Sequence, residues 1–112
     1  MVKKGDIYTV ELHAKKGSHI QNGVRPVIVV SSDQKNKGNI INITPLSSKI
    51  KRDDLYTHVV IDGYGLKYPS VTLCEHTMPI DKEDLSKARY VGTVTDKRLL
   101  DKITRINQMQ FV

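Results

Sequence analysis

Apolar residues recur with the period of β-strands along the first four-fifths of the chain, and this pattern constrains the possible folds most strongly. From Asp6 to Leu12 the large side chains of Tyr8, Val10 and Leu12 occupy every second position, as in a strand with two distinct faces. Residues 27–30 are all β-branched, which predicts a central strand buried on both faces. Four more strands are predicted at residues 39–44, 56–62, 71–75 and 90–94.

The period changes near residue 95. Leu99, Ile103 and Ile106 follow helical spacing after Thr95 or Asp96 as the N-cap, which predicts one amphipathic C-terminal helix. A short helical turn is predicted at residues 81–87, and long loops are predicted at 14–24 and from 45 to about 54. Many short strands followed by one helix predict a mainly β, strongly curved antiparallel sheet or barrel with small helices, in one domain spanning residues 1–112.

The positive charge is concentrated in one third of the chain. The net charge is +6, but residues 14–52 hold eight Lys and Arg against a single acid, Asp33, a local balance of +7. The remaining residues hold ten basic and eleven acidic side chains, a balance of −1. Such a segment can be an ordinary solvated surface, but it also provides the cationic face that a nucleic acid requires.

Other site types find little support in the sequence. The single cysteine, Cys74, excludes an internal disulfide, and its apolar neighbours predict a buried side chain rather than a nucleophile. The four histidines include no pair at metal-ligand spacing, so we expect neither a metal nor another cofactor. No apolar run reaches the roughly 18 residues of a membrane span. The N-terminus lacks a signal-peptide core, so we expect a cytoplasmic location.

An ordered series of short motifs resembles the MazF/PemK family of toxins and covers nearly the whole chain. The motifs are Gly5-Asp6-Ile7-Tyr8, Gly17-Ser18, Gly23-Val24-Arg25-Pro26-Val27-Ile28-Val29-Val30, Ile43-Thr44-Pro45-Leu46, Leu55-Tyr56-Thr57-His58-Val59, Gly65-Leu66, Pro69-Ser70-Val71, Leu73-Cys74-Glu75-His76, Ile80-Asp81-Lys82 and Val91-Gly92-Thr93-Val94. Each string alone is weak, but their common order is specific.

The resemblance implies a fold, an activity and partners. It implies a PemK/CcdB-like, SH3-like curved antiparallel barrel with a C-terminal helix, usually in a homodimer. Family members are sequence-specific endoribonucleases that cut single-stranded RNA and are silenced by a cognate antitoxin. Their catalytic residues are the arginine of Gly-x-Arg-Pro and the threonine that ends the third long strand. The resemblance places these roles on Arg25 and Thr44.

The chemistry of metal-free RNA cleavage suits these residues. The ribose 2′-hydroxyl attacks the adjacent phosphorus, and positive charge must stabilise the phosphorane-like transition state. A guanidinium is permanently charged and grips phosphate oxygens with two donors, and Pro26 keeps Arg25 in extended backbone. Thr44 would donate its hydroxyl hydrogen to the same phosphate. Without the resemblance, an ordinary surface arginine and an ordinary strand threonine would be the favoured interpretations of the two residues.

The sequence offers several candidate residues for proton transfer and for RNA recognition. His19 and His76 are the candidates for proton transfer, because an arginine with a pKa above 12 is a poor base. Many family members have Gly-Ser-Glu-Gln in the first loop, where this chain has Gly17-Ser18-His19-Ile20-Gln21, so an acidic helper from that loop is in doubt. The predicted RNA-binding residues are Gln21, Asn22, Ser47, Ser48, Lys49 and Lys51. Six aromatic residues argue against the broad stacking platform of other RNA-binding folds.

Two alternatives stay open. A toxin on the same barrel can poison DNA gyrase without being an enzyme, as CcdB does. A plain basic module can bind RNA or DNA with Arg25 contacting phosphate only. The Gly-x-Arg-Pro motif with a strand-end threonine favours cleavage over gyrase poisoning, and a cleavage assay is needed to separate it from simple binding. The local charge of +7 also predicts an acidic, partly disordered antitoxin as a partner.

Overall fold

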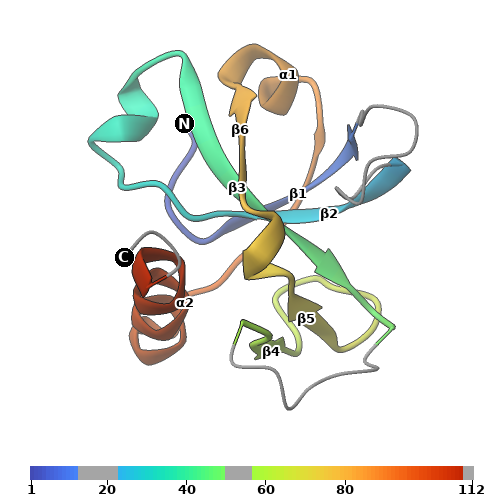
Figure 1. The fold of residues 1–112 in the computed structure, drawn as a ribbon. Helices are drawn as coiled ribbons and strands as arrows, with labels where there is room; N and C mark the ends of the chain where they lie inside the picture. The colour runs from blue at the N-terminus through green and yellow to red at the C-terminus, as the bar shows by residue number, and fades with distance from the viewer. Residues whose placement is uncertain (13–22, 50–56, 110–112) are drawn as a thin grey trace.

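The computed structural model describes residues 1–12, 23–49 and 57–109, which form a curled antiparallel sheet with two helices (Figure 1). The elements in chain order are β1 (Asp6–Leu12), β2 (Gly23–Val29), the 3₁₀ turn η1 (Lys35–Lys37), β3 (Ile40–Ser47), β4 (Val60–Ile61), β5 (Ser70–Thr72), the 3₁₀ turn η2 (Cys74–His76), β6 (Met78–Asp81), α1 (Lys82–Ser86), β7 (Arg89–Thr93) and α2 (Lys97–Met109). This mainly β half-barrel with a C-terminal helix confirms the predicted fold class.

Strand β3 is the centre of the sheet. The strand order is β4-β5-β3-β2-β1-β7, and β6 also pairs with β3. One edge of β3 is bonded to β2. Its other edge is bonded first to β6 and then, near its end, to β5, so β3 crosses the middle of the molecule between them in Figure 1.

The sheet separates two apolar cores, because neighbouring residues of a strand point to opposite faces. Ile28 lies in one core with Ile7 and Leu46, and α2 covers this core with Ile103 and Ile106. Val27 and Val29 lie in the other core, which Leu85 of α1 helps to close. Val27, Ile28 and Val29 are fully buried, which confirms a strand buried on both faces for these three residues. Val30, the fourth residue of the predicted run, follows the end of β2 and is only partly buried.

A tight turn after β4 presses against β7. Gly63, Tyr64 and Gly65 all have positive φ, with values of 96°, 56° and 89°. A Cβ atom added to Gly92 would lie 1.9 Å from the carbonyl oxygen of Tyr64, and one added to Gly65 would lie 2.2 Å from that of Val91. Only glycine allows such an approach, so these glycines fix the segment after β4 against β7.

The helix predictions agree well with the structure. Helix α2 begins at Lys97, and the carboxylate of Asp96 accepts hydrogen bonds from the backbone N–H groups of Arg98 and Leu99 at 2.9 and 3.4 Å. Asp96 is therefore the N-cap, one of the two residues proposed. Helix α1 spans five residues within the predicted helical turn. No helix in the described ranges is long and apolar enough to cross a membrane.

The strand predictions need corrections. Strand β1 has its predicted bounds, and β7 begins and ends one residue early. The predicted loop at 14–24 is wrong for residues 23 and 24, which belong to β2, and its residues 14–22 lie outside the described ranges. The loop predicted from residue 45 begins later, because Pro45, Leu46 and Ser47 continue β3. The Pro45 carbonyl accepts a bond from Leu73 N–H at 2.8 Å, so the proline remains part of the ladder.

Two further strand predictions fail in part. Within the described residues, the segment predicted at 56–62 contains only the short strand β4. Strand β5 ends at Thr72, and the 3₁₀ turn η2 replaces the rest of the segment predicted at 71–75. Strand β6 was not predicted, because Pro79 interrupts its pattern. Among the described strands β6 pairs with β3 alone, so an N–H on its other side is not needed and the proline is tolerated.

Candidate active site

Arg25 lies in β2, opposite Val10 of β1. The residue is half-buried. Pro26 follows it within the strand and pairs with Thr9. Arg25 shares a face of β2 with Val27 and Val29, because alternate residues of a strand point the same way. The predicted phosphate-binding cation therefore projects from a rigid strand, as preorganised charge stabilisation requires.

Thr44 lies in the interior of the protein. It is fully buried, and its hydroxyl lies 2.7 Å from the hydroxyl of Thr77. Thr77 donates its only hydroxyl hydrogen to Oδ1 of Asn107 at 2.6 Å, so it accepts from Thr44. The amide of Asn107 in turn donates to the Ile103 carbonyl at 3.1 Å. The hydroxyl hydrogen of Thr44 is thus engaged inside the protein.

The sheet register places Arg25 and Thr44 on opposite faces. Ile28 is paired with Thr44, and Val27 is paired with Pro45. Paired residues share a face, so Thr44 points with Ile28 into the core under α2, whereas Arg25 points with Val27 to the other side. The prediction that Thr44 ends the third long strand is wrong, because β3 continues for three more residues.

Ser47 occupies the position that was expected for Thr44. It is the last residue of β3 and is half-buried. Continuing the β2–β3 register by two residues sets Ser47 opposite Arg25, on the same face. The Lys49 backbone N–H donates to Ser47 Oγ at 3.2 Å. The serine oxygen is the acceptor in that bond, so its own hydrogen can be donated to another group.

The other predicted site residues divide into two groups. Ser48 and Lys49 follow Ser47 directly and are exposed, so three of the predicted RNA-binding residues adjoin the end of β3. His76 is the half-buried last residue of η2. The remaining ones lie outside the described residues: His19, Gln21, Asn22 and Lys51.

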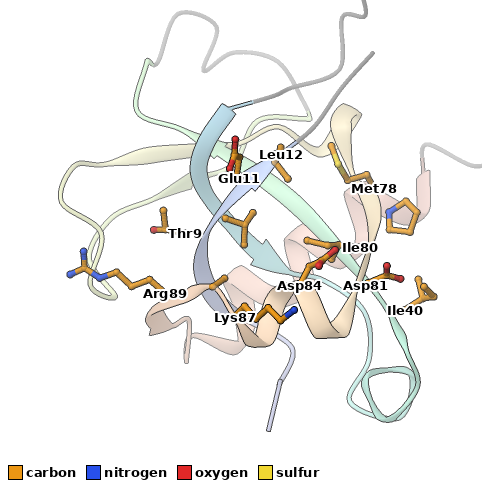
Figure 2. A pocket seen from close by; sticks show the side chains of 13 residues that line it. Thr9, Glu11, Leu12, Ile40, Met78, Ile80, Asp81, Asp84, Lys87 and Arg89 are labelled. Atoms are coloured by element: carbon orange, nitrogen blue, oxygen red, sulfur yellow. The ribbon is translucent and has the colours of Figure 1, made fainter. Parts of the chain in front are cut away.

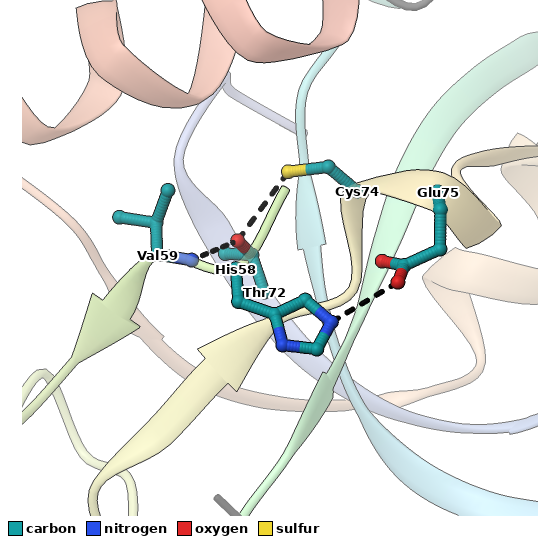
Figure 3. A network of polar contacts seen from close by, with 5 residues as sticks. All are labelled: His58, Val59, Thr72, Cys74 and Glu75. Atoms are coloured by element: carbon teal, nitrogen blue, oxygen red, sulfur yellow. Dashed lines mark hydrogen bonds and ion pairs between the residues drawn. The ribbon is translucent and has the colours of Figure 1, made fainter. Parts of the chain in front are cut away.

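The structure adds a histidine–carboxylate pair that sequence reasoning missed. His58 Nε2 lies 3.0 Å from Glu75 Oε2, and the side chains are 10% and 36% exposed (Figure 3). Beside this pair, Thr72 Oγ1 accepts hydrogen bonds from the Val59 backbone N–H and the Cys74 thiol. The histidine and the carboxylate are seventeen positions apart, so only the β4–β5 pairing brings them together.

The pairing also shows which face His58 occupies. Val60 pairs with Val71, and the bonds from Thr72 N–H to the Val59 carbonyl and from Cys74 N–H to the Thr57 carbonyl continue this register. His58 therefore lies opposite Leu73, which is bonded to Pro45 of β3. Its side chain projects from the face that carries Arg25 and Ser47.

Cys74 behaves as the sequence predicted. It is buried in the core under α2. Burial raises the pKa of its thiol above the ordinary value of 9.0; the hydrogen bond to Thr72 lowers it and the nearby Glu75 raises it further. A neutral, buried thiol is a packing residue rather than a nucleophile.

A groove of about 680 Å³ lies between β1, β6 and α1 (Figure 2). Its lining includes Val10 and Ile80, the carboxylates of Glu11, Asp81 and Asp84, and the cations of Lys87 and Arg89. The charge of this lining is therefore mixed. Across the described ranges, no three His, Cys, Asp or Glu side chains form a cluster that could hold a metal ion.

Comparison with known proteins identifies the class to which this half-barrel belongs. The family model described as "PemK-like, MazF-like toxin of type II toxin-antitoxin system" matches residues 3–109. The chain belongs to this family, which confirms the resemblance seen in its motifs.

Particular relatives agree with this assignment. The chain is 36% identical over 112 residues to Endoribonuclease EndoA of Bacillus subtilis (strain 168), covering 97% of this chain and 93% of that protein. Its fold is similar to the crystal structure of MazF (Form-I) from Deinococcus radiodurans, with a TM-score of 0.78, 17% identity, and 98% and 96% of the two chains covered. It is also similar to an endoribonuclease in complex with its cognate antitoxin from Mycobacterial species, with a TM-score of 0.77, 18% identity, and 99% and 95% covered.

Proposed function

We propose that this toxin is a sequence-specific, metal-independent endoribonuclease that cuts single-stranded RNA. The observation that carries the proposal is the position of Arg25: a half-buried cation on a paired strand, which shares its face with the hydroxyl at the end of β3. Membership of the toxin family and a sequence identity of 36% to a protein named an endoribonuclease support the same activity. The cytoplasm, where RNA substrates are found, is its proposed location.

In the proposed reaction the ribose 2′-oxygen attacks the adjacent phosphorus while a base removes the 2′-hydroxyl proton. The bond from phosphorus to the 5′-oxygen breaks, and an acid protonates that oxygen. The products are a 2′,3′-cyclic phosphate and a 5′-hydroxyl fragment, so no oxidant or water is consumed in this step. Arg25 holds the non-bridging oxygens, where its two-pronged guanidinium stabilises the developing charge.

We infer that Ser47, rather than Thr44, supplies the hydroxyl of the catalytic pair. Thr44 is fully buried and its hydrogen is bound to Thr77, so a phosphate could reach it only after the core opened. Ser47 ends β3, is half-buried and lies opposite Arg25 in the continued register. A serine hydroxyl can donate to phosphate as a threonine hydroxyl does.

Proton transfer remains assigned to histidine. His19 and His76 stay candidates, and His58 joins them because it projects from the face of Arg25 and is oriented by Glu75. A carboxylate that holds one ring nitrogen fixes the direction of the other, as a base–orienter pair requires.

The direct test mixes purified protein with single-stranded RNA, with an all-deoxy copy of the same sequence, and with RNA in the presence of EDTA. We expect cleavage of RNA only, undiminished by the chelator, with 5′-hydroxyl products. Arg25→Ala should abolish cutting, whereas Arg98→Ala, an exposed arginine of α2, should not. RNA that stays intact across several unrelated sequences would favour the gyrase-poison or simple binding alternatives.

Two binding partners are inferred from the positive charge of the chain and from its family. We propose that the protein forms a homodimer and that an acidic antitoxin neutralises it by covering the segment with a local charge of +7. One solved structure of similar fold is an endoribonuclease in complex with its cognate antitoxin. Co-expression of the toxin with an acidic protein encoded beside it should block RNA cleavage. If that protein neither binds nor blocks, the charge argument is wrong.

A further inference from the structure

Helix α2 carries one polar side chain on the face that it buries. The buried residues of α2 are Ile103 and Ile106, which pack in the core, and Asn107. Asn107 is only 8% exposed. A buried amide lowers stability unless it is hydrogen-bonded, and an apolar side chain would suit this face of the helix better. The contribution of Asn107 therefore lies in the hydrogen bonds that it makes.

One of these bonds joins α2 to the 3₁₀ turn η2. Thr77, the residue that follows η2, donates its hydroxyl hydrogen to Oδ1 of Asn107 at 2.6 Å. Its hydroxyl oxygen lies 2.7 Å from the hydroxyl of Thr44, and its backbone N–H donates to the Cys74 carbonyl at 3.2 Å. The Thr77 side chain is therefore held between α2 and the central strand β3, while its backbone closes the turn.

The same turn carries the carboxylate of the histidine pair. Glu75 lies in the middle of η2, and its Oε2 is 3.0 Å from Nε2 of His58 (Figure 3). Its neighbour Cys74 is buried in the core under α2. His58 projects from the face that carries Arg25 and Ser47. One residue of the turn therefore contacts the core under α2, and the next reaches the proposed active site.

The two ends of η2 are held in different ways. At its start, the N–H groups of Leu73 and Cys74 donate to the carbonyls of Pro45 and Thr57 at 2.8 and 3.3 Å. At its end, the side chain of Thr77 makes the bonds to β3 and α2. The hydrogen bonds within a short 3₁₀ turn have poorer geometry than those of an α-helix, so such a turn depends strongly on contacts with its surroundings.

Resting on the proposed ribonuclease function, we propose that Thr77 and Asn107 are positioning residues for the cleavage reaction. The bond between them fixes the end of η2 and thereby holds the Glu75 carboxylate where it orients the His58 ring. Both residues act through Glu75 and not on the RNA. Because a misplacement of about 1 Å can slow a reaction by about 10²-fold, a loosened turn lowers the rate without removing a reacting group.

The first test measures the rate of RNA cleavage. Thr77→Val keeps the shape of the side chain and removes the hydroxyl. We expect kcat to fall by about 10- to 100-fold with little change in KM, because the lost interaction supports the transition state only. Thr77→Ser keeps the hydroxyl and should recover most of the rate. Thr104→Val is the matched control: the Thr104 hydroxyl donates within α2, to the Leu100 carbonyl at 2.9 Å, and its loss should leave the rate unchanged.

A double-mutant cycle shows whether Thr77 acts through the carboxylate. Glu75→Gln alone should lower kcat, because an amide orients the His58 ring less strongly than a carboxylate does. Adding Thr77→Val to Glu75→Gln should then cause little further loss, since residues that act as one unit are not additive. Two losses that multiply in full would overturn the proposal.

NMR of the histidine ring nitrogens tests the same connection without RNA. The signals of His58, assigned with a His58→Gln variant, should move in Thr77→Val toward their positions in Glu75→Gln. A purely structural role of Thr77 would lower the Tm and leave the His58 signals of the folded protein unchanged, which would also overturn the proposal.

Asn107→Leu removes the same bond from the side of the helix and suits the buried face, so it provides the test if Thr77→Val does not fold. Folded Asn107→Leu that cuts RNA at the wild-type rate, with unchanged His58 signals, would overturn the positioning role and leave the ribonuclease standing. Wild-type protein that cuts no RNA would overturn the proposed function. In that case, a change of the His58 signals in Asn107→Leu would still support the connection from α2 to the histidine.

Discussion

Substitution of Thr44 should lower the stability of the protein, whereas substitution of Ser47 should lower its catalytic rate. Thr44→Val preserves the shape of the side chain but removes the hydroxyl that donates to Thr77. The Thr77 oxygen then loses the hydrogen bond that it accepts from residue 44. Such a loss costs about 1–3 kcal/mol. With an unfolding entropy of about 2.1 cal/mol/K per residue, each kcal/mol lowers the Tm of a chain of this length by about 4 °C. We therefore expect Tm to fall by about 4–12 °C.

The rate of RNA cleavage should depend on Ser47 and hardly at all on Thr44. Ser47→Ala removes a half-buried side chain at the end of a strand, so Tm should change little. If Ser47 donates to the transition-state phosphate, kcat should fall by about 10²- to 10³-fold. Folded Thr44→Val should cut RNA at nearly the wild-type rate, and Thr44→Ser, which keeps the hydroxyl, should recover most of the lost stability.

The measurements are thermal unfolding by circular dichroism and single-turnover cleavage of an RNA oligonucleotide at a temperature where every variant is folded. The reasoning fails if Thr44→Val retains its Tm but loses cleavage more than tenfold. It also fails if Ser47→Ala cuts as fast as wild type does.

Three further perturbations test the fold. Gly92→Ala places a Cβ 1.9 Å from the Tyr64 carbonyl and should cost about 1–3 kcal/mol or more in a denaturant titration; Gly38→Ala, whose nearest contact would be 3.3 Å, is the control, and equal losses would contradict the steric argument. Asp96→Ala removes the N-cap of α2 and should cost about 1 kcal/mol, measured in the same way; an unchanged midpoint would exclude that role. Because the folded state raises the pKa of Cys74, stability should decline as pH rises above about 9, where the unfolded thiol ionises more readily. Cys74→Ala should flatten that decline, and an equally steep one would assign it to other groups.

Local pattern was enough to predict much of the fold. Strand β1, the buried run of β2 and the capped helix α2 each depend on contacts a few residues apart, so their periods are visible in the sequence. Strand β6 and the last residues of β3 contain prolines, which local rules assign to loops. These segments form strands because β3 pairs with β2, β5 and β6, which come from different parts of the chain.

The site was predicted less completely, because its geometry depends on register. Arg25 stands out from its motif alone, but the face that Thr44 occupies depends on where β3 ends. The same holds for His58 and Glu75, which meet only through the pairing of β4 with β5. A one-residue change in register exchanges the faces of a strand, so spacing alone could not choose between Thr44 and Ser47.

The double pairing of β3 has a consequence for how the molecule opens. Fraying of β6 leaves the β2 edge bonded, and fraying of β5 leaves most of the other ladder intact. Amide protons in the middle of β3 should therefore exchange with deuterium only through global unfolding, while those of β7 at the sheet margin exchange earlier through local opening. The toxin can thus loosen at the rim of its sheet without releasing its central strand.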